Sequence, residues 1–198
     1  MSKEKQLDLF TAGAEDKKPS AKTVREPQPQ SKAAKSLLVS TVPIKPFLRV
    51  YIDGASRGNP GKAGAGIFCV DRTNKTLFKN GFYLGRRTNN QAEYEALVLA
   101  AMLVTEHLGD DTTTKVIFIS DSQLLVRQMS GIYKVKNAEL KKLRDVATIL
   151  LANTPHSFKH VFREDNTHAD ALANKGIDSI VKIPENLLKT LAQHNITL

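Results

Sequence analysis

The stretch that decides the fold runs Phe47-Leu48-Arg49-Val50-Tyr51-Ile52-Asp53-Gly54-Ala55-Ser56-Arg57-Gly58-Asn59-Pro60-Gly61. Its first six residues are mostly β-branched, aromatic or otherwise apolar, which predicts a strand over residues 47–52. Asp53 follows that strand directly, and Asn59-Pro60-Gly61 has the composition of a turn. A carboxylate at the carboxyl end of a strand indicates a site at the edge of a sheet.

Beyond this stretch the pattern alternates between strands and helices. We predict strands over residues 64–70 and 76–84, joined by a hairpin turn at 71–75, and further strands over 115–120 and 157–163. We predict helices over residues 90–108, 122–129, 137–151 and 167–177. This order predicts an α/β fold with a five-stranded mixed sheet flanked by helices.

Composition narrows the class of protein further. The 198 residues, 41% of them hydrophobic, suffice for one domain with a real core and an appendage. A single Cys excludes a disulfide framework and a Cys-built zinc site. No apolar run is long enough to span a membrane, and no apolar segment follows the first charged residues, so we expect a cytoplasmic location without a secretory signal. The net charge of +9 suggests a polyanionic partner, with nucleic acid first.

The first 46 residues differ from the rest. They hold five of the eight Pro and a single aromatic residue. Such a segment cannot bury enough apolar surface to offset its ordering entropy, so we predict a disordered basic tether. We assign residues 47–178 to the folded domain. Residues 179–198 are then a C-terminal tail, with a short helix expected around 184–194.

Four acidic residues occupy positions that packing alone would not favour. Asp53 and Asp121 directly follow predicted strands, Glu93 lies one turn into a long helix, and Asp170 lies among alanines early in the last helix. Each one singly also fits a turn, a cap or a helix-dipole role. Together they suggest converging carboxylates, which repel one another unless a hard divalent cation lies between them.

Four segments together resemble the motifs of type 1 ribonuclease H. They are residues 53–61, 88–94, 121–123 and 165–173, and their order, spacing and predicted context agree over residues 48–177. The resemblance implies a ribonuclease H-like fold and hydrolysis of the RNA strand of RNA–DNA hybrids by two Mg²⁺ ions, with Mn²⁺ as the alternative metal. Primer or R-loop removal is the setting that it implies.

The resemblance also implies roles for the acids. Asp53 would bridge both ions, Asp121 would hold the ion on the nucleophile side, and Glu93 and Asp170 would hold the ion on the leaving-group side. One metal then generates hydroxide while the other stabilises the leaving oxygen.

Further polar residues of these motifs are implied to contact the hybrid. Asn59, Asn90 and Gln123, with help from Asn89, would contact the minor groove, where amides can test for a 2′-OH. Thr88 would belong to a phosphate pocket for the DNA strand. The Asn59 segment equally fits a plain turn, and Asn89-Asn90 a helix N-cap.

Two departures from the family pattern matter. The segment 126–137 is short and keeps Lys134 and Lys136, but it lacks the basic, Trp-containing insertion of some members. The loop before Asp170 has no His, where many members carry one that assists proton transfer or product release. His168 does not match that position and better fits an exposed helix residue, whereas Arg163 and Glu164 remain open as substitutes.

The tether contains Gln6-Leu7-Asp8-Leu9-Phe10, which resembles the bacterial sliding-clamp-binding motif at all five positions. The resemblance implies that this peptide binds the clamp, with Leu9 and Phe10 in an apolar pocket and Gln6 anchored by hydrogen bonds. Leu7 is also among the implied partner-binding residues. The alternative is a chance apolar patch.

Three functions therefore compete. The leading hypothesis is a monomeric Mg²⁺-dependent endoribonuclease acting on RNA–DNA hybrids. The alternative from another class is a non-catalytic hybrid-binding or sliding-clamp adaptor that retains the fold. The acidic quartet argues against it, because acids beside a polyanion weaken binding. A third hypothesis, a related nuclease for DNA or branched junctions, is disfavoured by the amide set.

Overall fold

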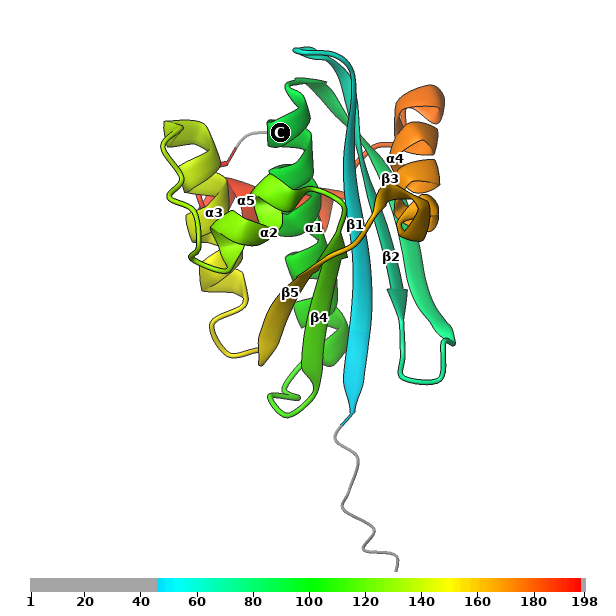
Figure 1. The fold of residues 1–198 in the computed structure, drawn as a ribbon, viewed down its shortest axis with the longest axis vertical. Coiled ribbons are helices and arrows are strands. Elements are labelled where there is room, and N and C mark those ends of the chain that lie inside the picture. The colour runs from blue at the N-terminus through cyan, green and yellow to red at the C-terminus, as the bar shows by residue number, and fades with distance from the viewer. Residues whose placement is uncertain (1–45, 197–198) are drawn as a thin grey trace, which may run out of the picture. The chain divides into compact units, whose positions relative to one another are not determined.

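The computed structural model describes residues 46–196, which are built around a five-stranded sheet. Its strands are β1 (Phe47–Gly58), β2 (Gly61–Val70), β3 (Thr76–Arg87), β4 (Lys115–Ser120) and β5 (His156–His160). They lie in the order β3-β2-β1-β4-β5 (Figure 1). β1 and β3 pair antiparallel with β2, whereas β4 is parallel to both β1 and β5. The predicted mixed sheet is therefore confirmed.

Helices cover both faces of the sheet. They are α1 (Asn89–Leu108), α2 (Gln123–Met129), α3 (Ala138–Leu150), α4 (Thr167–Ser179) and α5 (Glu185–Gln193). Figure 1 shows α4 on one side of the sheet and the other four helices on the opposite side. A short 3-10 turn, Arg163–Asp165, leads from β5 into α4. No helix within residues 46–196 has both the length and the apolar character needed to cross a bilayer.

The core lies mainly between the sheet and α1. Every α1 residue from Ala92 to Met102 is buried, because β1 covers one side of the helix and α3 the other. A helix enclosed in this way is apolar around most of its circumference. Leu187 and Leu191 of α5 join the same apolar cluster. The buried charged residues of α1, such as Glu93 and Glu95, depart from this apolar pattern. Each needs a partner that offsets the cost of burying its charge.

Local signals in the sequence mark several element ends correctly. Asn137 caps α3, its Oδ1 accepting from the backbone N–H of Leu140 at 3.0 Å. Gly109 ends α1 as a C-cap with φ +53°, a conformation that favours glycine. Asp121 directly follows β4, as predicted. The division into tether, folded domain and tail stays a prediction, and the predicted clamp-binding peptide lies outside the described residues.

Several strand ends differ from the prediction. β2 begins at Gly61 rather than at residue 64, and β3 ends at Arg87 rather than at residue 84. β1 does not stop at Ile52 but continues to Gly58, so Asp53 lies inside the strand rather than after it. The reason is the long hairpin with β2, whose pairing runs on from Asp53↔Gly66 to Gly58↔Gly61 and overrides weak local strand propensity. β5 ends at His160, whereas the prediction extended it to Arg163, because the chain turns there toward α4.

Candidate active site

β1 and α1 approach each other closely at Gly54. A Cβ atom on Gly54 would lie 2.1 Å from the backbone nitrogen of Glu93 and 2.5 Å from the carbonyl oxygen of Ala92. No side chain fits in that space, so glycine alone permits the contact. The preceding residue, Asp53, is thereby brought beside Glu93 on the first turns of α1.

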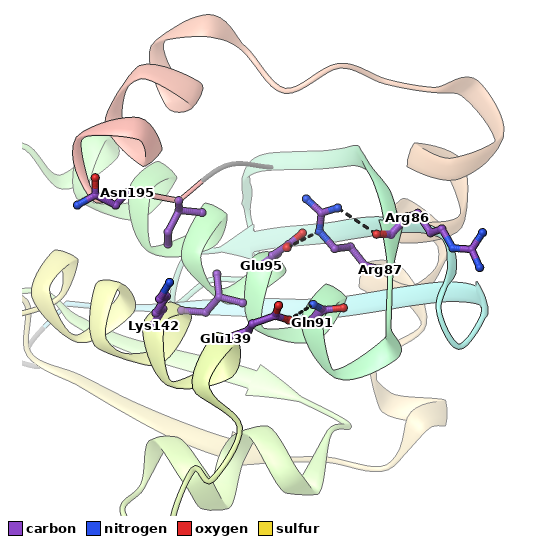
Figure 2. A pocket seen from close by; sticks show the side chains of 9 residues that line it. Arg86, Arg87, Gln91, Glu95, Glu139, Lys142 and Asn195 are labelled. Carbon is purple, nitrogen blue, oxygen red and sulfur yellow. Dashed lines mark hydrogen bonds and ion pairs between the residues drawn. The ribbon is translucent and has the colours of Figure 1, made fainter.

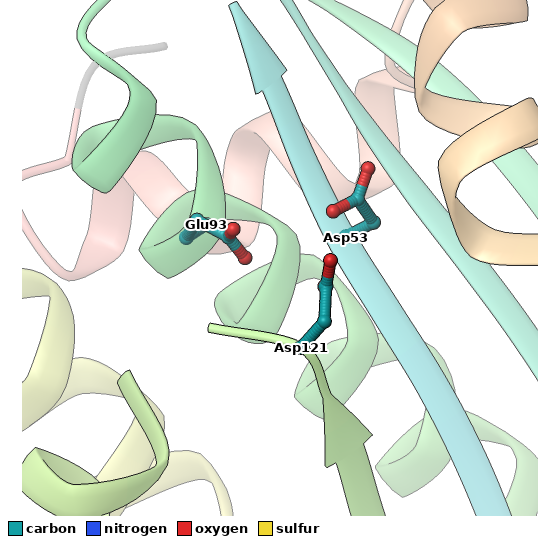
Figure 3. A group of neighbouring side chains, drawn as sticks. All are labelled: Asp53, Glu93 and Asp121. Atoms are coloured by element: carbon teal, nitrogen blue, oxygen red, sulfur yellow. The ribbon is translucent and has the colours of Figure 1, made fainter. Parts of the chain in front are cut away.

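The parallel pairing of β1 with β4 adds a third acid. Tyr51 pairs with Ile119, and Asp53 and Asp121 each lie two residues further on, at the same end of the sheet. One carboxylate oxygen from each of Asp53, Glu93 and Asp121 lies within 4.8 Å of the others (Figure 3). Asp53 and Glu93 are buried and Asp121 is partly buried, so the three acids form a semi-enclosed cluster.

Asp170 reaches this region from the other face of the sheet. Gly66, the β2 partner of Asp53, would carry a Cβ only 1.9 Å from the carbonyl oxygen of Ala169, so α4 lies directly against the strand. Asp170 follows Ala169 but is not one of the three converging acids. Its Oδ1 accepts from Nη2 of Arg163 at 2.7 Å, and Asn174 donates to its Oδ2 at 3.3 Å.

The electrostatics of the cluster disfavour charge. Burial, followed by repulsion from Asp121 and Asp170, raises the pKa of Asp53 from 3.8 to about 7. Burial and then the carboxylates of Asp53 and Asp121 raise the pKa of Glu93 well above its usual range. Arg163 opposes both effects, although it is already paired with Asp170. Without further positive charge, Asp53 and Glu93 hold protons at pH values where ordinary carboxyls are ionised.

The residues present fit a divalent cation. All the converging donors are carboxylate oxygens, the ligands that hard cations such as Mg²⁺ prefer. Oε2 of Glu93 is buried and has no hydrogen-bond partner in the part of the chain that the structure describes. An orphaned buried acceptor is costly, and a cation between the acids would satisfy it.

Two neighbouring residues support the acids, and one of them had no predicted role. Asn166 is 1% exposed, and its Nδ2 donates both to Oδ1 of Asp121 at 3.0 Å and to the carbonyl oxygen of Ile52 at 2.9 Å. It therefore orients Asp121. The sequence offered little signal for this role, because Asn166 precedes a helix and resembles an ordinary cap. Arg163, one of the two possible substitutes for the missing loop histidine, contacts Asp170.

Four of the predicted hybrid-contacting residues lie at the N-terminal ends of α1 and α2, and the fifth, Asn59, lies in the β1–β2 turn. Oδ1 of Asn59 accepts from the backbone N–H of Asn89 at 3.1 Å, which joins the β1–β2 turn to α1. Thr88 is the N-cap of α1 in a reciprocal capping box with Gln91. The remaining two, Asn90 and Gln123, are exposed.

Other sequence candidates lie elsewhere. His168 is exposed and packs against Phe68, with ring centroids 4.6 Å apart, which agrees with the expected exposed helix position. The four predicted clamp-binding residues, Gln6, Leu7, Leu9 and Phe10, lie outside the described residues.

Comparisons with known proteins agree with this geometry. Residues 51–176 match a family model described as reverse transcriptase-like. Ribonuclease HI of Halobacterium salinarum is 39% identical over 132 residues, which cover 66% of this chain and 64% of that protein. The bifunctional protein Rv2228c of Mycobacterium tuberculosis is 40% identical over 132 residues, covering 66% of this chain and 35% of that protein. The chain thus spans less than two thirds of the length of these relatives.

Solved structures of ribonucleases H1 are also similar to this chain. The crystal structure of ribonuclease H1 from Halobacterium salinarum has a TM-score of 0.62 and 38% identity, covering 67% of this chain and 98% of that one. LC11-RNase H1 in complex with an RNA/DNA hybrid has a TM-score of 0.65 and 38% identity, covering 67% of this chain and 97% of that one. The chain therefore belongs to the type 1 ribonuclease H-like family.

Proposed function

We propose that this protein is a divalent-metal-dependent endoribonuclease that hydrolyses the RNA strand of RNA–DNA hybrids. The observation that carries the proposal is the convergence of Asp53, Glu93 and Asp121, each of which has an oxygen within 4.8 Å of the others. Among residues 46–196, the buried Oε2 of Glu93 has no hydrogen-bond partner. The family supports the substrate class, because relatives are named ribonuclease H and LC11-RNase H1 was solved with a hybrid bound.

Four acids are the proposed metal ligands, and Mg²⁺ is the proposed ion, with Mn²⁺ as the alternative. Asp53 would bridge two ions, Asp121 would serve the nucleophile side, and Glu93 and Asp170 would serve the leaving-group side. When bound, two such ions activate the attacking water and stabilise the leaving 3′-oxygen. Oδ1 of Asp170 is already engaged by Arg163, so Oδ2, which accepts from Asn174 at 3.3 Å, would be the oxygen shared with a metal.

Arg163 supplies a positive charge near the position where many family members carry a loop histidine. It does not replace the proton transfer that such a histidine assists. Its side chain is 76% exposed and reaches the acids through Asp170. A guanidinium stays protonated throughout the physiological range, so it cannot accept a proton from water or a leaving group. Its contribution is positive charge beside a site that must receive an anionic phosphodiester.

The amides next to the site would discriminate RNA from DNA. A ribose 2′-OH both donates and accepts hydrogen bonds, as a side-chain amide does. Because Oδ1 of Asn59 already accepts from Asn89, its NH₂ group remains to donate to a ribose oxygen. Asn90 and Gln123, both exposed, would complete the minor-groove contacts, with Asn89 assisting and Thr88 facing a DNA phosphate.

The experiment is a cleavage assay on end-labelled RNA–DNA hybrid, double-stranded RNA, double-stranded DNA and single-stranded RNA, with Mg²⁺, with Mn²⁺ and with EDTA. We expect cleavage of the hybrid's RNA strand alone, and none in EDTA. The matched control, Asp53→Asn, should lose cleavage while hybrid binding survives or strengthens, because negative charge is removed from a phosphate site. Comparable cleavage by this variant would contradict the metal assignment.

The setting of this activity is also a proposal. We infer a monomeric cytoplasmic enzyme that removes primers or R-loops, in line with the basic composition and the short motif at residues 6–10. That motif would dock Leu9 and Phe10 in an apolar pocket of a bacterial sliding clamp, with Gln6 and Leu7 completing the contact. A peptide spanning residues 1–14 should bind purified clamp, and a Phe10→Ala peptide should not. Failure of the first peptide to bind would remove the docking proposal.

A further inference from the structure

Besides Glu93, α1 carries another buried carboxylate, which is not one of the three converging acids. Glu95 is 4% exposed, yet it follows Glu93 by two residues and so points to another side of the helix. Figure 2 shows it facing Arg87, at the end of β3. Nε of Arg87 donates to Oε1 of Glu95 at 2.6 Å, with side chains 19% and 6% exposed respectively. The two residues form a largely buried ion pair.

Arg87 makes four contacts, three of which are with other elements of the chain. Its side chain reaches α1 through Glu95, and its Nη1 donates to the carbonyl oxygen of Arg86 at 3.0 Å. Its own carbonyl oxygen accepts from Oγ of Ser56 on β1 at 2.8 Å. In the sheet it pairs with Gly61, the first residue of β2. The ion pair therefore fixes the end of β3 against both β1 and α1.

The residues fixed in this way adjoin the proposed hybrid contacts. Thr88 follows Arg87 directly and caps α1. Asn59 lies in the turn that leads to Gly61, and its Oδ1 holds the backbone N–H of Asn89. A shift at Arg87 would therefore move Thr88 and disturb the Asn59–Asn89 contact. The acids are positioned by further contacts, namely the close approach at Gly54, the hydrogen bonds of Asn166 and the β1–β4 pairing, and these contacts remain when the ion pair is lost.

Stability alone does not explain the ion pair. Removing two charges from water is expensive, and an apolar pair of similar volume is often as stable or more stable. Oε2 of Glu95 has no hydrogen-bond partner among residues 46–196, which adds to the cost. The carboxylate borders a cavity of about 320 Å³, whose rim includes Glu139 and Lys142 (Figure 2). The pair does, however, hold the end of β3 in a fixed position against α1 and β1.

We propose that Arg87 and Glu95 are positioning residues for hybrid recognition, which hold Thr88 and the Asn59–Asn89 contact in place before substrate arrives. This inference rests on the proposed function and deepens it. Because the acids are held independently, loss of the pair should weaken substrate binding and leave the chemical step intact. The proposal therefore predicts a change in KM rather than in kcat.

The test compares R87M, E95Q and the double variant R87M/E95L with the unmodified chain. The matched control is R144M, which breaks the Arg144–Asp145 ion pair on α3. Four quantities are measured: KM and kcat on RNA–DNA hybrid, the thermal unfolding midpoint, and hydrogen exchange over residues 86–92. The exchange measurement reports the Asn89 amide without requiring any activity.

We expect R87M/E95L to keep the unfolding midpoint and kcat, while KM rises about tenfold and exchange over residues 86–92 accelerates. E95Q, which retains an acceptor for Arg87, should show a smaller rise, and R144M none. If the unmodified chain cleaves hybrids but R87M/E95L keeps its KM, the positioning role alone is overturned. If the unmodified chain leaves hybrids intact, the proposed function fails, and this inference fails with it.

Discussion

The backbone nitrogen of Glu93 lies 2.1 Å from the point that a Cβ on Gly54 would occupy. Asp53 and Glu93 come from distant parts of the chain. They are neighbours because Gly54, where β1 contacts α1, has no side chain. The close contact also explains why both acids are buried. The convergence of these two acids is thus a consequence of backbone packing between β1 and α1.

Gly54→Ala should damage both stability and activity. The added methyl group must push α1 away from β1, which we expect to cost about 1–3 kcal/mol of unfolding free energy. Because Glu93 moves with the helix, hybrid cleavage should fall by about a hundredfold or more even in the fraction that remains folded. Thermal unfolding and steady-state cleavage measure the two effects. Gly109→Ala, strained at φ +53° but located at the far end of α1, should lose stability only. Equal activities of the two variants would contradict this account.

The metal-free protein should lose stability as the pH rises from about 4 toward 7. The pKa of Asp53 is raised in the folded state from 3.8 to about 7, so in this interval the folded state binds more protons than the unfolded state. Stability contributed by the protonated carboxyl is therefore lost as the pH rises through that window. Glu93 acts in the same direction.

Chemical denaturation in EDTA at several pH values checks this prediction. Asp53→Asn should flatten the slope, because the substituted side chain does not titrate. Mg²⁺ should stabilise the protein more at pH 8 than at pH 5, since the ion competes with protons for the same oxygens. A stability that rises steadily between pH 4 and pH 7 would show that folding does not raise the pKa of Asp53 and Glu93.

Asn166→Ala should loosen Asp121. The substitution leaves the carbonyl oxygen of Ile52 and Oδ1 of Asp121 without their shared donor. We expect a loss of about 1–3 kcal/mol in stability. The concentration of Mg²⁺ needed for half-maximal cleavage should rise by about 10–100-fold, as is usual when a residue that orients a metal ligand is removed. Asn153→Ala, an exposed position, provides the control. An unchanged Mg²⁺ titration would exclude this orienting role.

Arg163→Gln should separate metal binding from catalysis. The variant releases Asp170 from its partner and makes the site more negative, so half-maximal activity should require less Mg²⁺. The maximal rate should fall by about a hundredfold, because a cation beside the reacting phosphodiester is lost. Lys115→Gln makes the same charge change at the start of β4, the opposite end of that strand from Asp121, and should alter neither quantity. If the Arg163→Gln variant needs more Mg²⁺ for half-maximal activity while its maximal rate falls, Arg163 acts through the fold alone.

The sequence predicted most elements because their signals are local. The apolar run of β4, the Asn137 cap of α3 and the Gly109 end of α1 each depend on neighbours within a few residues. β1 was predicted too short for the same reason: the small residues after Ile52 have weak strand propensity, and pairing with β2 extends the strand regardless.

The candidate acids, too, could be chosen from the sequence, because a carboxylate amid apolar residues is conspicuous and the motif spacing is specific. The unequal environments of these acids could not be predicted from the sequence. Asp53, Glu93 and Asp121 converge, whereas Asp170 is engaged by Arg163, and that difference depends on how α4 lies against Gly66. The orienting role of Asn166 and the Arg87–Glu95 pair likewise join residues that no local pattern relates.

The sequence by itself determined the element order, the residue types available for metal and hybrid binding, and the family resemblance. These depend on backbone propensity, hydrophobic periodicity and side-chain chemistry, all of which are encoded along the chain. Only the tertiary structure decided which carboxylates share a site, which one takes a cationic partner and which buried charges lie outside the cluster. Those outcomes depend on distances of a few ångströms between segments that meet only when the sheet and helices pack.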